Sequence, residues 1–510
     1  MVKKEKTDGM SRRRFFKGAA LAGGIVAGSG LVGGLALAAP ARTDGVPRKW
    51  DRETDVLVIG TGFAGLAAAI EAHDAGAKVL IIEKMPIIGG NSIIAGGGLN
   101  AVDPVRQAKD NLEDSIDKHY QQTLEGGDFR GDPVRVRALV ENALAQVEWC
   151  EKEGIKWLDR TIMNTGALFP RGHLPVFPAE QGKGIILGLA TRVKDRGIPI
   201  LMEHKVTRII RRGFLAGDIL GLEVERKGKK MAFKARRGVV LASGGFGHDY
   251  KLLGIHNPMI TKEVPSSNHP GATGEILMQA QDVGAYLVGM DFIQIHPSLG
   301  APKPGRFSTD ARYYCMVNTE GKRFIREDGR RDVQVAAIFK QPGKYFWMIW
   351  DDWGRKDLRV KDEVIEKNVK AGNIFRGNTL RELAEQIKVP GENLENTVAR
   401  YNKLVEQGKD DDFGKDKYNL PYKLQVAPFY AHMNKPAIHH CMGGILTDVK
   451  SQVVGRDYEP IPRLYAGGEV TGGIQGANRL GGNATPDCLF YGRVAGKNAA
   501  AQKPWDGKKA

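Results

Sequence analysis

Short apolar runs alternate with glycine-dense turns in the part of the chain that follows residue 50. Residues 56–59 are all aliphatic, which is typical of a parallel strand buried on both faces. The glycine-rich turn 60–65 comes next, and an alanine-rich segment that ends near Gly76 predicts a helix. A second apolar run, 79–82, predicts another strand. The order strand, helix, strand predicts a βαβ unit and an α/β fold.

The turn G-T-G-F-A-G at 60–65 predicts a phosphate-binding site. We expect Gly60 to make the turn, Gly62 to let the backbone approach a pyrophosphate, and Gly65 to let helix and strand pack closely. The N-terminus of the following helix supplies N–H donors for the phosphates. Glu83, which follows the second strand, stands where an acidic side chain holds a ribose hydroxyl. Because NAD and FAD share this fingerprint, the turn by itself predicts only a dinucleotide.

Residues 1–38 have the pattern of a targeting segment. The sequence S-R-R-R-F-F-K at 11–17 resembles a twin-arginine export signal, and an apolar stretch at 18–37 and A-L-A at 36–38 follow it. We expect a cleaved signal peptide and export of the cofactor-loaded protein to the periplasm. No later stretch approaches eighteen uninterrupted apolar residues, so the mature chain is expected to be soluble. The alternative interpretation of 18–37 is a membrane anchor.

Composition narrows the class of protein. The 510 residues are 42% hydrophobic and 26% charged, as in a globular enzyme of two or more domains. Residues 1–38 hold seven basic and two acidic side chains, a net +5, so the remainder carries about +11 of the total +16. The basic residues are scattered, which does not favour nucleic acid. An anionic substrate and an acidic redox partner fit better, although a solvated surface without function is an equal alternative.

The four cysteines are far apart, and the sequence has neither C-x-x-C nor the C-x-x-C-H that attaches a c-type haem. We therefore expect no bound metal and no haem in this chain.

Further motifs appear in a characteristic order. Glycine-dense loops at 86–92 and 95–100 follow the second strand, and glycine-rich segments return at 239–246, 268–274, 439–444, 465–473 and 478–483. I-Q-I-H-P stands at 293–297. With these motifs, the sequence from about 54 to 497 resembles the soluble fumarate reductase and flavocytochrome c flavoproteins, relatives of succinate dehydrogenase.

The resemblance implies a fold and a cofactor. It implies a Rossmann-like FAD-binding domain formed by residues 51–290 and 439–510, with an inserted α+β capping domain at 291–438. Relatives with covalently bound flavin carry a histidine in the second glycine loop, where this chain has Asn91. The FAD is therefore expected to be non-covalent. Residues that the resemblance assigns to the cofactor are Gly60, Gly62, Ala64, Gly65, Glu83, Lys84, Gly89, Gly90, Asn91, Ser92, Gly97, Gly98, Val206, Gly244, Gly245, Thr273, Gly274, Glu469 and Asn483.

The resemblance also implies reduction of an activated C=C bond. His439 and Arg479 would bind one substrate carboxylate, His296 and Thr309 would bind the other end, and Arg331 would deliver the proton. Guanidinium suits a carboxylate because it offers two parallel donors and stays charged. Asp310 would resupply the proton to Arg331. Each of these residues has a structural alternative, such as a phosphate contact for Arg479 or a solvated charge cluster around Arg331.

Departures from the family pattern leave the substrate open. The segment after Ser308 is shorter than usual, so the register of Asp310 and Arg312 in a proton relay is uncertain, and Gln475 replaces a common histidine. Fumarate, acrylate, methacrylate or a larger conjugated acid all fit. The other classes of function are a 3-ketosteroid-type flavin dehydrogenase and a non-catalytic flavin electron carrier. Because this chain has no haem motif, a separate donor is expected, either a c-type cytochrome or a membrane quinol-linked cytochrome.

Overall fold

The computed structural model describes residues 45–298, 310–358 and 360–507. The predicted signal at 1–38 and Thr309 lie outside the described residues. The strand order of the largest sheet is β19-β20-β10-β1-β2-β7, with the hairpin β8–β9 paired to β10. Strands β20, β10, β1, β2 and β7 run parallel to one another. The bounds are β1 Arg52–Ile59, β2 Val79–Ile82, β7 Ile200–Leu201, β8 Lys205–Gly213, β9 Ala216–Arg226, β10 Lys229–Leu241, β19 Gln452–Val454 and β20 Pro460–Ala466.

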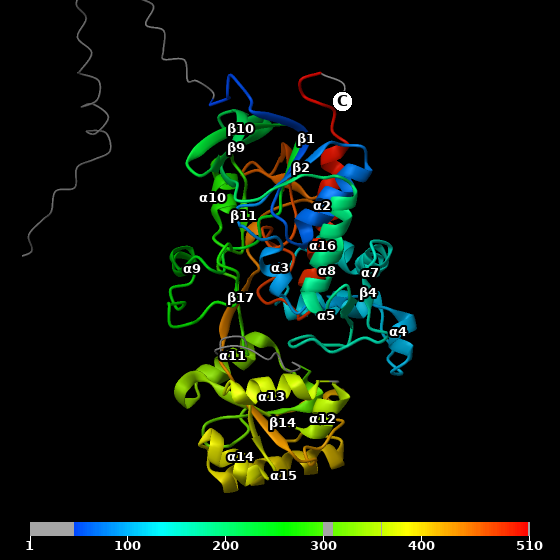
Figure 1. Ribbon diagram of the computed structural model, residues 1–510, viewed down its shortest axis with the longest axis vertical. Coiled ribbons are helices and arrows are strands. Elements are labelled where there is room, and N and C mark those ends of the chain that lie inside the picture. Colours follow the sequence, from blue (N-terminus) through cyan, green and yellow to red (C-terminus); the bar gives the residue numbers. More distant parts are fainter. Residues whose placement is uncertain (1–44, 299–309, 359, 508–510) are drawn as a thin grey trace, which may run out of the picture. The chain divides into compact units, whose positions relative to one another are not determined.

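The apolar run in β1 is buried on both faces, as the sequence predicts. Val56 and Val58 belong to a core shared with the helices α2, α8 and α16. Leu57 and Ile59 point the other way, into a core that β8, β9 and α10 complete. This alternation follows from the two-residue period of a strand. Figure 1 shows α2 (Phe63–Asp74), α8 (Gln181–Asp195) and α16 (Ala484–Ala500) gathered beside β1 and β2.

Helix α16 packs closely on α2, although more than 400 residues separate them in the sequence. A Cβ atom added to Gly496 would lie 2.1 Å from the backbone oxygen of Ala68, so only glycine allows this approach. Both ends of the described chain thereby contribute to one layer, which brings the motifs at 465–483 next to the first βαβ unit.

A second sheet is antiparallel, in the order β13-β14-β16-β15. Along β14, Phe346, Met348 and Trp350 pack toward α11 and α13. Trp347 and Ile349 pack toward α14 and α15 on the other face. Figure 1 shows α13 and the pair α14–α15 on opposite sides of β14. The bounds are β13 Cys315–Val317, β14 Phe346–Asp351, β15 Phe375–Gly377, β16 Phe429–Asn434, α11 Arg331–Phe339, α13 Asp362–Lys370, α14 Leu380–Ile387 and α15 Gly391–Gln407.

Two antiparallel strands join the two sheets. The chain passes through β12 (Ile293–His296) before it forms the second sheet, and it returns through β17 (Ala437–Cys441). The α/β fold with an inserted α+β region is therefore confirmed. The domain boundaries 51–290, 291–438 and 439–510 stay predictions, because residues 44–510 group as one compact unit.

The remaining elements are short and surround these sheets. Within the described ranges, no helix is long and apolar enough to span a membrane. The other helices are α3 Gly90–Ile94, α4 Pro104–Ala108, α5 Ile116–Gly126, α6 Pro133–Glu141, α7 Ala143–Lys152, α9 Tyr250–His256, α10 Glu275–Asp282 and α12 Asp352–Asp357. Three small two-stranded sheets pair β3 Leu99–Asn100 with β5 Gly172–His173, β4 Lys156–Trp157 with β6 Pro175–Phe177, and β11 Leu287–Val288 with β18 Gly444–Ile445.

Candidate active site

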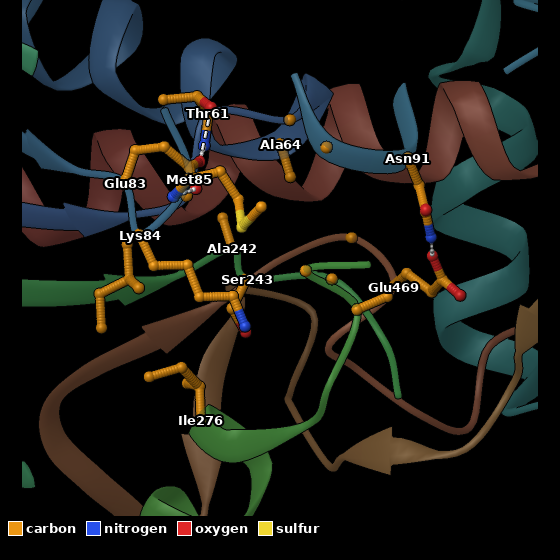
Figure 2. A pocket seen from close by; sticks show the side chains of 18 of the residues that line it. Thr61, Ala64, Glu83, Lys84, Met85, Asn91, Ala242, Ser243, Ile276 and Glu469 are labelled. Carbon is orange, nitrogen blue, oxygen red and sulfur yellow. Dashed lines mark hydrogen bonds between the residues drawn. The ribbon is translucent and has the colours of Figure 1, made fainter. Parts of the chain in front are cut away.

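A pocket opens above the carboxyl end of β1, where the chain turns into α2 (Figure 2). Gly60 has φ +103°, a left-handed conformation that disfavours other residues. A Cβ atom added to Gly65 would lie 2.0 Å from the backbone oxygen of Gly60. The glycines therefore allow a tight turn that places the N-terminus of α2 at the pocket wall, where the helix dipole favours an anion.

Glu83 supports this turn from the end of β2. Its Oε2 atom accepts hydrogen bonds from the backbone N–H of Thr61 at 3.1 Å and from the Thr61 hydroxyl at 2.6 Å. Its Oε1 atom accepts from the backbone N–H of Met85 at 2.9 Å. The side chain is buried and lines the pocket, as Figure 2 shows. A carboxylate has about four lone-pair sites, so capacity for a ribose hydroxyl remains.

At another part of the pocket, Asn91 faces the buried carboxylate of Glu469 (Figure 2). The Asn91 Nδ2 atom donates to Asn268 Oδ1 at 2.7 Å and to Glu469 Oε2 at 3.4 Å. Asn91 Oδ1 accepts from the backbone N–H of His269 at 2.7 Å. Burial raises the pKa of Glu469, although a hydrogen bond from the backbone of Cys441 opposes this shift. Asn91 is thus fixed as a hydrogen-bonding residue of the pocket wall.

The structure brings most predicted cofactor residues to this pocket. Its lining includes Gly60, Gly62, Ala64, Glu83, Lys84, Gly89, Gly90, Asn91, Ser92, Val206, Gly244, Gly274 and Glu469. Gly65, Gly97, Gly98, Gly245, Thr273 and Asn483 are not among the lining residues. A Cβ atom at Gly97 would meet the backbone of Gln181, and one at Gly98 would meet Asn164, so these two glycines allow close packing.

Thr273 and Asn483 form hydrogen bonds with neighbouring side chains. The Lys84 ammonium donates to Thr273 Oγ1 at 2.6 Å and to Glu275 Oε2 at 2.7 Å. Asn483 Oδ1 accepts from Asn100 at 2.9 Å, in a buried network below α16. Lining residues that sequence reasoning missed include Thr61, Phe63, Met85, His204, Lys205, Ser243, His269, Glu275, Ile276 and Cys488. Most of them lie within or next to the predicted motifs, so their position in the sequence could have identified them.

A second group of functional side chains gathers where α11, β12 and the loop before α16 meet. Arg331 Nε donates to the backbone oxygen of Thr165 at 3.0 Å, and its Nη1 atom donates to Gln294 Oε1 at 2.8 Å. Arg479 Nη2 donates to the same Gln294 oxygen at 3.2 Å. All three side chains are almost fully buried. The two arginines predicted to bind substrate and deliver a proton therefore converge on one amide oxygen.

Burial lowers the pKa of Arg331 well below its usual range, and the positive charge of Arg479 adds to this effect. Burial also lowers the pKa of Arg479 to about 10. Within the described ranges, neither guanidinium forms an ion pair with a carboxylate. The carboxylates of Glu469 and Asp487 attract Arg479 without pairing with it. Buried charges are normally paired, so two guanidiniums without an ion-pair partner suit an anion.

The two predicted histidines complete the group. His296 and His439 lie edge to face, with ring centroids 5.0 Å apart. The Ser267 hydroxyl lies 3.1 Å from His439 Nδ1. Burial lowers the pKa of His439 well below 6.5, and the charges of His296, Arg331 and Arg479 lower it further. Burial and the neighbouring groups therefore favour the neutral form of the His439 imidazole.

Asp310 lies at the start of a short 3-10 turn, Ala311–Tyr313. Its buried carboxylate pairs with Arg312 at 2.6 Å, and Arg312 Nη1 donates to the Tyr418 hydroxyl at 3.4 Å. Thr309 precedes it outside the described residues. The structure therefore defines Asp310 and Arg312 as a pair and does not test their path to Arg331.

In this second group of side chains, Gln294 is the residue that sequence reasoning missed. It lies two positions before His296 in β12, and side chains at i and i+2 share a face of a strand. The alternation in I-Q-I-H at 293–296 therefore indicated that Gln294 lies on the same face as His296.

Comparisons with known proteins agree with this geometry. The family described as FAD binding domain matches residues 55–485. The fumarate reductase (cytochrome) of Shewanella frigidimarina is 38% identical over 88% of this chain and 77% of its own length. The acrylate reductase flavoprotein subunit of Shewanella woodyi is 31% identical over 96% and 98%. The NADH:acrylate oxidoreductase of Vibrio harveyi is 34% identical over 88% of this chain, which spans 50% of that relative.

A solved structure of the open conformation of a flavocytochrome c3 fumarate reductase has a TM-score of 0.71 and 32% identity, over 98% of this chain and 83% of that one.

The fold and the glycine-lined pocket define a flavin-dependent oxidoreductase. This chain belongs to the succinate dehydrogenase/fumarate reductase flavoprotein family. Its cofactor is FAD, and it is an oxidoreductase that acts on CH–CH bonds. The pocket fits FAD because glycine backbone and the polar side chains of Glu83, Asn91 and Glu469 line it together.

Proposed function

We propose that this enzyme reduces the C=C bond of an α,β-unsaturated carboxylate, fumarate or a related 2-enoate. The observation that carries the proposal is the pair of buried guanidiniums, Arg331 and Arg479, without a carboxylate partner in the described part of the chain. Related proteins are named for fumarate and acrylate, which share an enoate group. An enoate carboxylate would supply the missing negative charge.

In this proposal Arg479 and His439 bind the carboxylate conjugated to the alkene. FAD held in the glycine-lined pocket, with Glu83 and Asn91 in its wall, would supply the hydride that reduces the β-carbon of the alkene. Negative charge then develops on the conjugated carboxylate, where fixed donors in a buried site stabilise it strongly. Arg479 provides the permanent charge, and the neutral His439 provides a hydrogen bond or accepts a proton as the anion binds.

Arg331 delivers a proton to the α-carbon. A guanidinium is a poor acid in water, but burial and the charge of Arg479 both lower the pKa of Arg331. The Thr165 carbonyl and Gln294 hold its side chain in one orientation. Asp310 with Arg312 would resupply the proton, and His296 with Thr309 would contact the far end of the substrate.

The wider setting of the enzyme follows the same proposal. We expect residues 291–438 to act as a cap that closes over the substrate and excludes water. The FAD is held without a covalent bond. Electrons come from a separate donor, a c-type or membrane quinol-linked cytochrome, in the periplasm after cleavage of residues 1–38.

A reduced-viologen assay on a panel of enoates and enones tests the function. The holoenzyme should oxidise the dye with fumarate, acrylate, methacrylate or a larger enoate, and NADH should not replace the dye. Turnover of 3-ketosteroids alone would indicate the steroid-type alternative. A flavin that is reduced by dye but reoxidised by no member of the panel would indicate an electron carrier.

A further inference from the structure

Gln294 occupies a central position between the two arginines. Its Oε1 atom accepts from Arg331 at 2.8 Å and from Arg479 at 3.2 Å. Its Nε2 atom donates to Asn478 Oδ1 at 2.9 Å and to the backbone oxygen of Arg479 at 2.7 Å. Only 3% of the residue is exposed. A primary amide has two donors and two acceptor lone pairs, so every hydrogen-bonding position of Gln294 is used.

These contacts connect parts of the chain that are far apart. Arg331 begins α11, Gln294 lies in the linking strand β12, and Arg479 belongs to the loop before α16. Two like charges that share a buried site repel each other. The Thr165 carbonyl accepts from Arg331 and the Leu480 carbonyl accepts from Arg479, but neither carbonyl contacts both guanidiniums. The single amide oxygen aligns both guanidiniums, while its two N–H groups fix the loop that carries Arg479.

The neutrality of this amide matters as much as its geometry. A carboxylate in the same place would form charge-assisted hydrogen bonds to both guanidiniums and would cancel one of the two positive charges. This carboxylate would then compete with the anionic substrate for the two guanidiniums. An apolar side chain of the same length would keep the charge but would leave both guanidiniums without the shared acceptor.

We propose that Gln294 is a positioning residue that aligns Arg331 and Arg479 and, because it is neutral, leaves their charge available to the substrate carboxylate. The proposal rests on the enoate reductase function proposed above. It assigns Gln294 two separable effects, one on anion binding through charge and one on turnover through alignment.

Two variants of similar volume separate these effects. Gln294→Glu changes charge and keeps the shape, whereas Gln294→Met keeps neutrality and removes the acceptor. Both are prepared as FAD-loaded enzyme, with flavin content and thermal unfolding measured first. Fumarate and acrylate are then titrated into oxidised enzyme, with the flavin absorbance change giving Kd. Reduced viologen gives kcat and KM. Gln452→Glu, in the edge strand β19 outside this site, is the control for a new carboxylate.

We expect Gln294→Glu to raise Kd at least 30-fold for the carboxylate that binds the wild-type enzyme. Gln294→Met should lower kcat at least 30-fold and change Kd less than fivefold. The control should match wild type. Equal Kd values for wild type and Gln294→Glu, or wild-type kcat in Gln294→Met, would overturn the proposal.

A rise in Kd and a fall in kcat by the same factor in both variants would also overturn the proposal. That result would indicate that Gln294 has only a structural role. Failure of the proposed function is distinguishable from these results. In that case wild-type enzyme itself would neither bind nor reduce fumarate, acrylate or any other carboxylate of the panel.

Discussion

His439 lies edge to face against His296, and the guanidiniums of Arg331 and Arg479 also act on its ring. Burial is the largest cause of the low pKa of His439, and these three neighbours add to it. The positive charge gathered around the His439 imidazole explains why the site suits an anion. The lowered pKa of His439 also makes the stability of the protein depend on pH.

We expect the free energy of unfolding to fall as the pH drops from 6.5 to 5. The folded protein keeps His439 neutral, whereas the unfolded chain binds a proton below the ordinary histidine pKa, so acid favours unfolding. One such group contributes at most about 1.4 kcal/mol per pH unit. Urea unfolding of the holoenzyme should show a smaller loss in His439→Gln.

His439→Gln should still lose some free energy of unfolding in acid, because other buried histidines remain. One of them is His432, whose pKa is lowered to about 4 by burial. The exposed His73→Gln serves as the control and should retain the full wild-type slope. An identical pH dependence in wild type and His439→Gln would contradict the assignment of a neutral buried His439.

Arg331→Ala should turn over at least a thousandfold more slowly, which is about 4 kcal/mol of activation free energy. It should keep its FAD, because Arg331 is not part of the cofactor pocket lining. Arg331→Lys keeps the charge but loses the planar geometry, so it should also lose most activity. Steady-state kinetics with reduced viologen measures both variants, and the half-exposed Arg330→Ala should stay within threefold of wild type.

Arg479→Ala should weaken substrate binding as well as turnover, since Arg479 is proposed to bind the carboxylate. The Kd of the substrate, measured from the flavin absorbance, should rise at least tenfold in this variant and by a smaller factor in Arg331→Ala. Turnover above one tenth of wild type in Arg331→Ala would mean that another residue delivers the proton.

Gly65→Ala should lose FAD and destabilise the fold by about 1–3 kcal/mol, the usual cost of overpacking. The added Cβ atom would lie 2.0 Å from the Gly60 backbone oxygen, which would push α2 away from the turn. The ratio of flavin to protein and urea unfolding measure the two effects. Gly254→Ala in α9 is the control. Its Cβ atom would meet open space, so this variant should be neutral or slightly stabilising. Full FAD content in Gly65→Ala would show that this close approach is dispensable.

Acid precipitation should release all FAD into the supernatant, because Asn91 cannot form the covalent link that a histidine forms. Its amide is instead engaged with Asn268, His269 and Glu469. The measurement is flavin absorbance in the supernatant, with in-gel fluorescence of the denatured polypeptide as the check. Yellow fluorescence that stays with the polypeptide would show that another residue carries the flavin.

The sequence by itself determined the local features of this protein. Strand, turn and helix at 52–74 depend on neighbouring residues, so the apolar run and the spacing of Gly60, Gly62 and Gly65 predicted them correctly. Local pattern also indicated the α/β class, which the structure confirms. The residue types of the candidate site, His, Arg and Glu within glycine-rich motifs, were equally visible in the sequence.

Only the tertiary structure decided which of these residues meet. Gln294 lies 37 positions from Arg331 and 185 from Arg479, and no local pattern relates such distant positions. Gly97 and Gly98 pack against Gln181 and Asn164, which lie more than 60 residues further along the chain. The reason is physical: pairing of β12 with β17 and packing of α16 on α2 place side chains through long-range burial, which the order of residues in one segment does not specify.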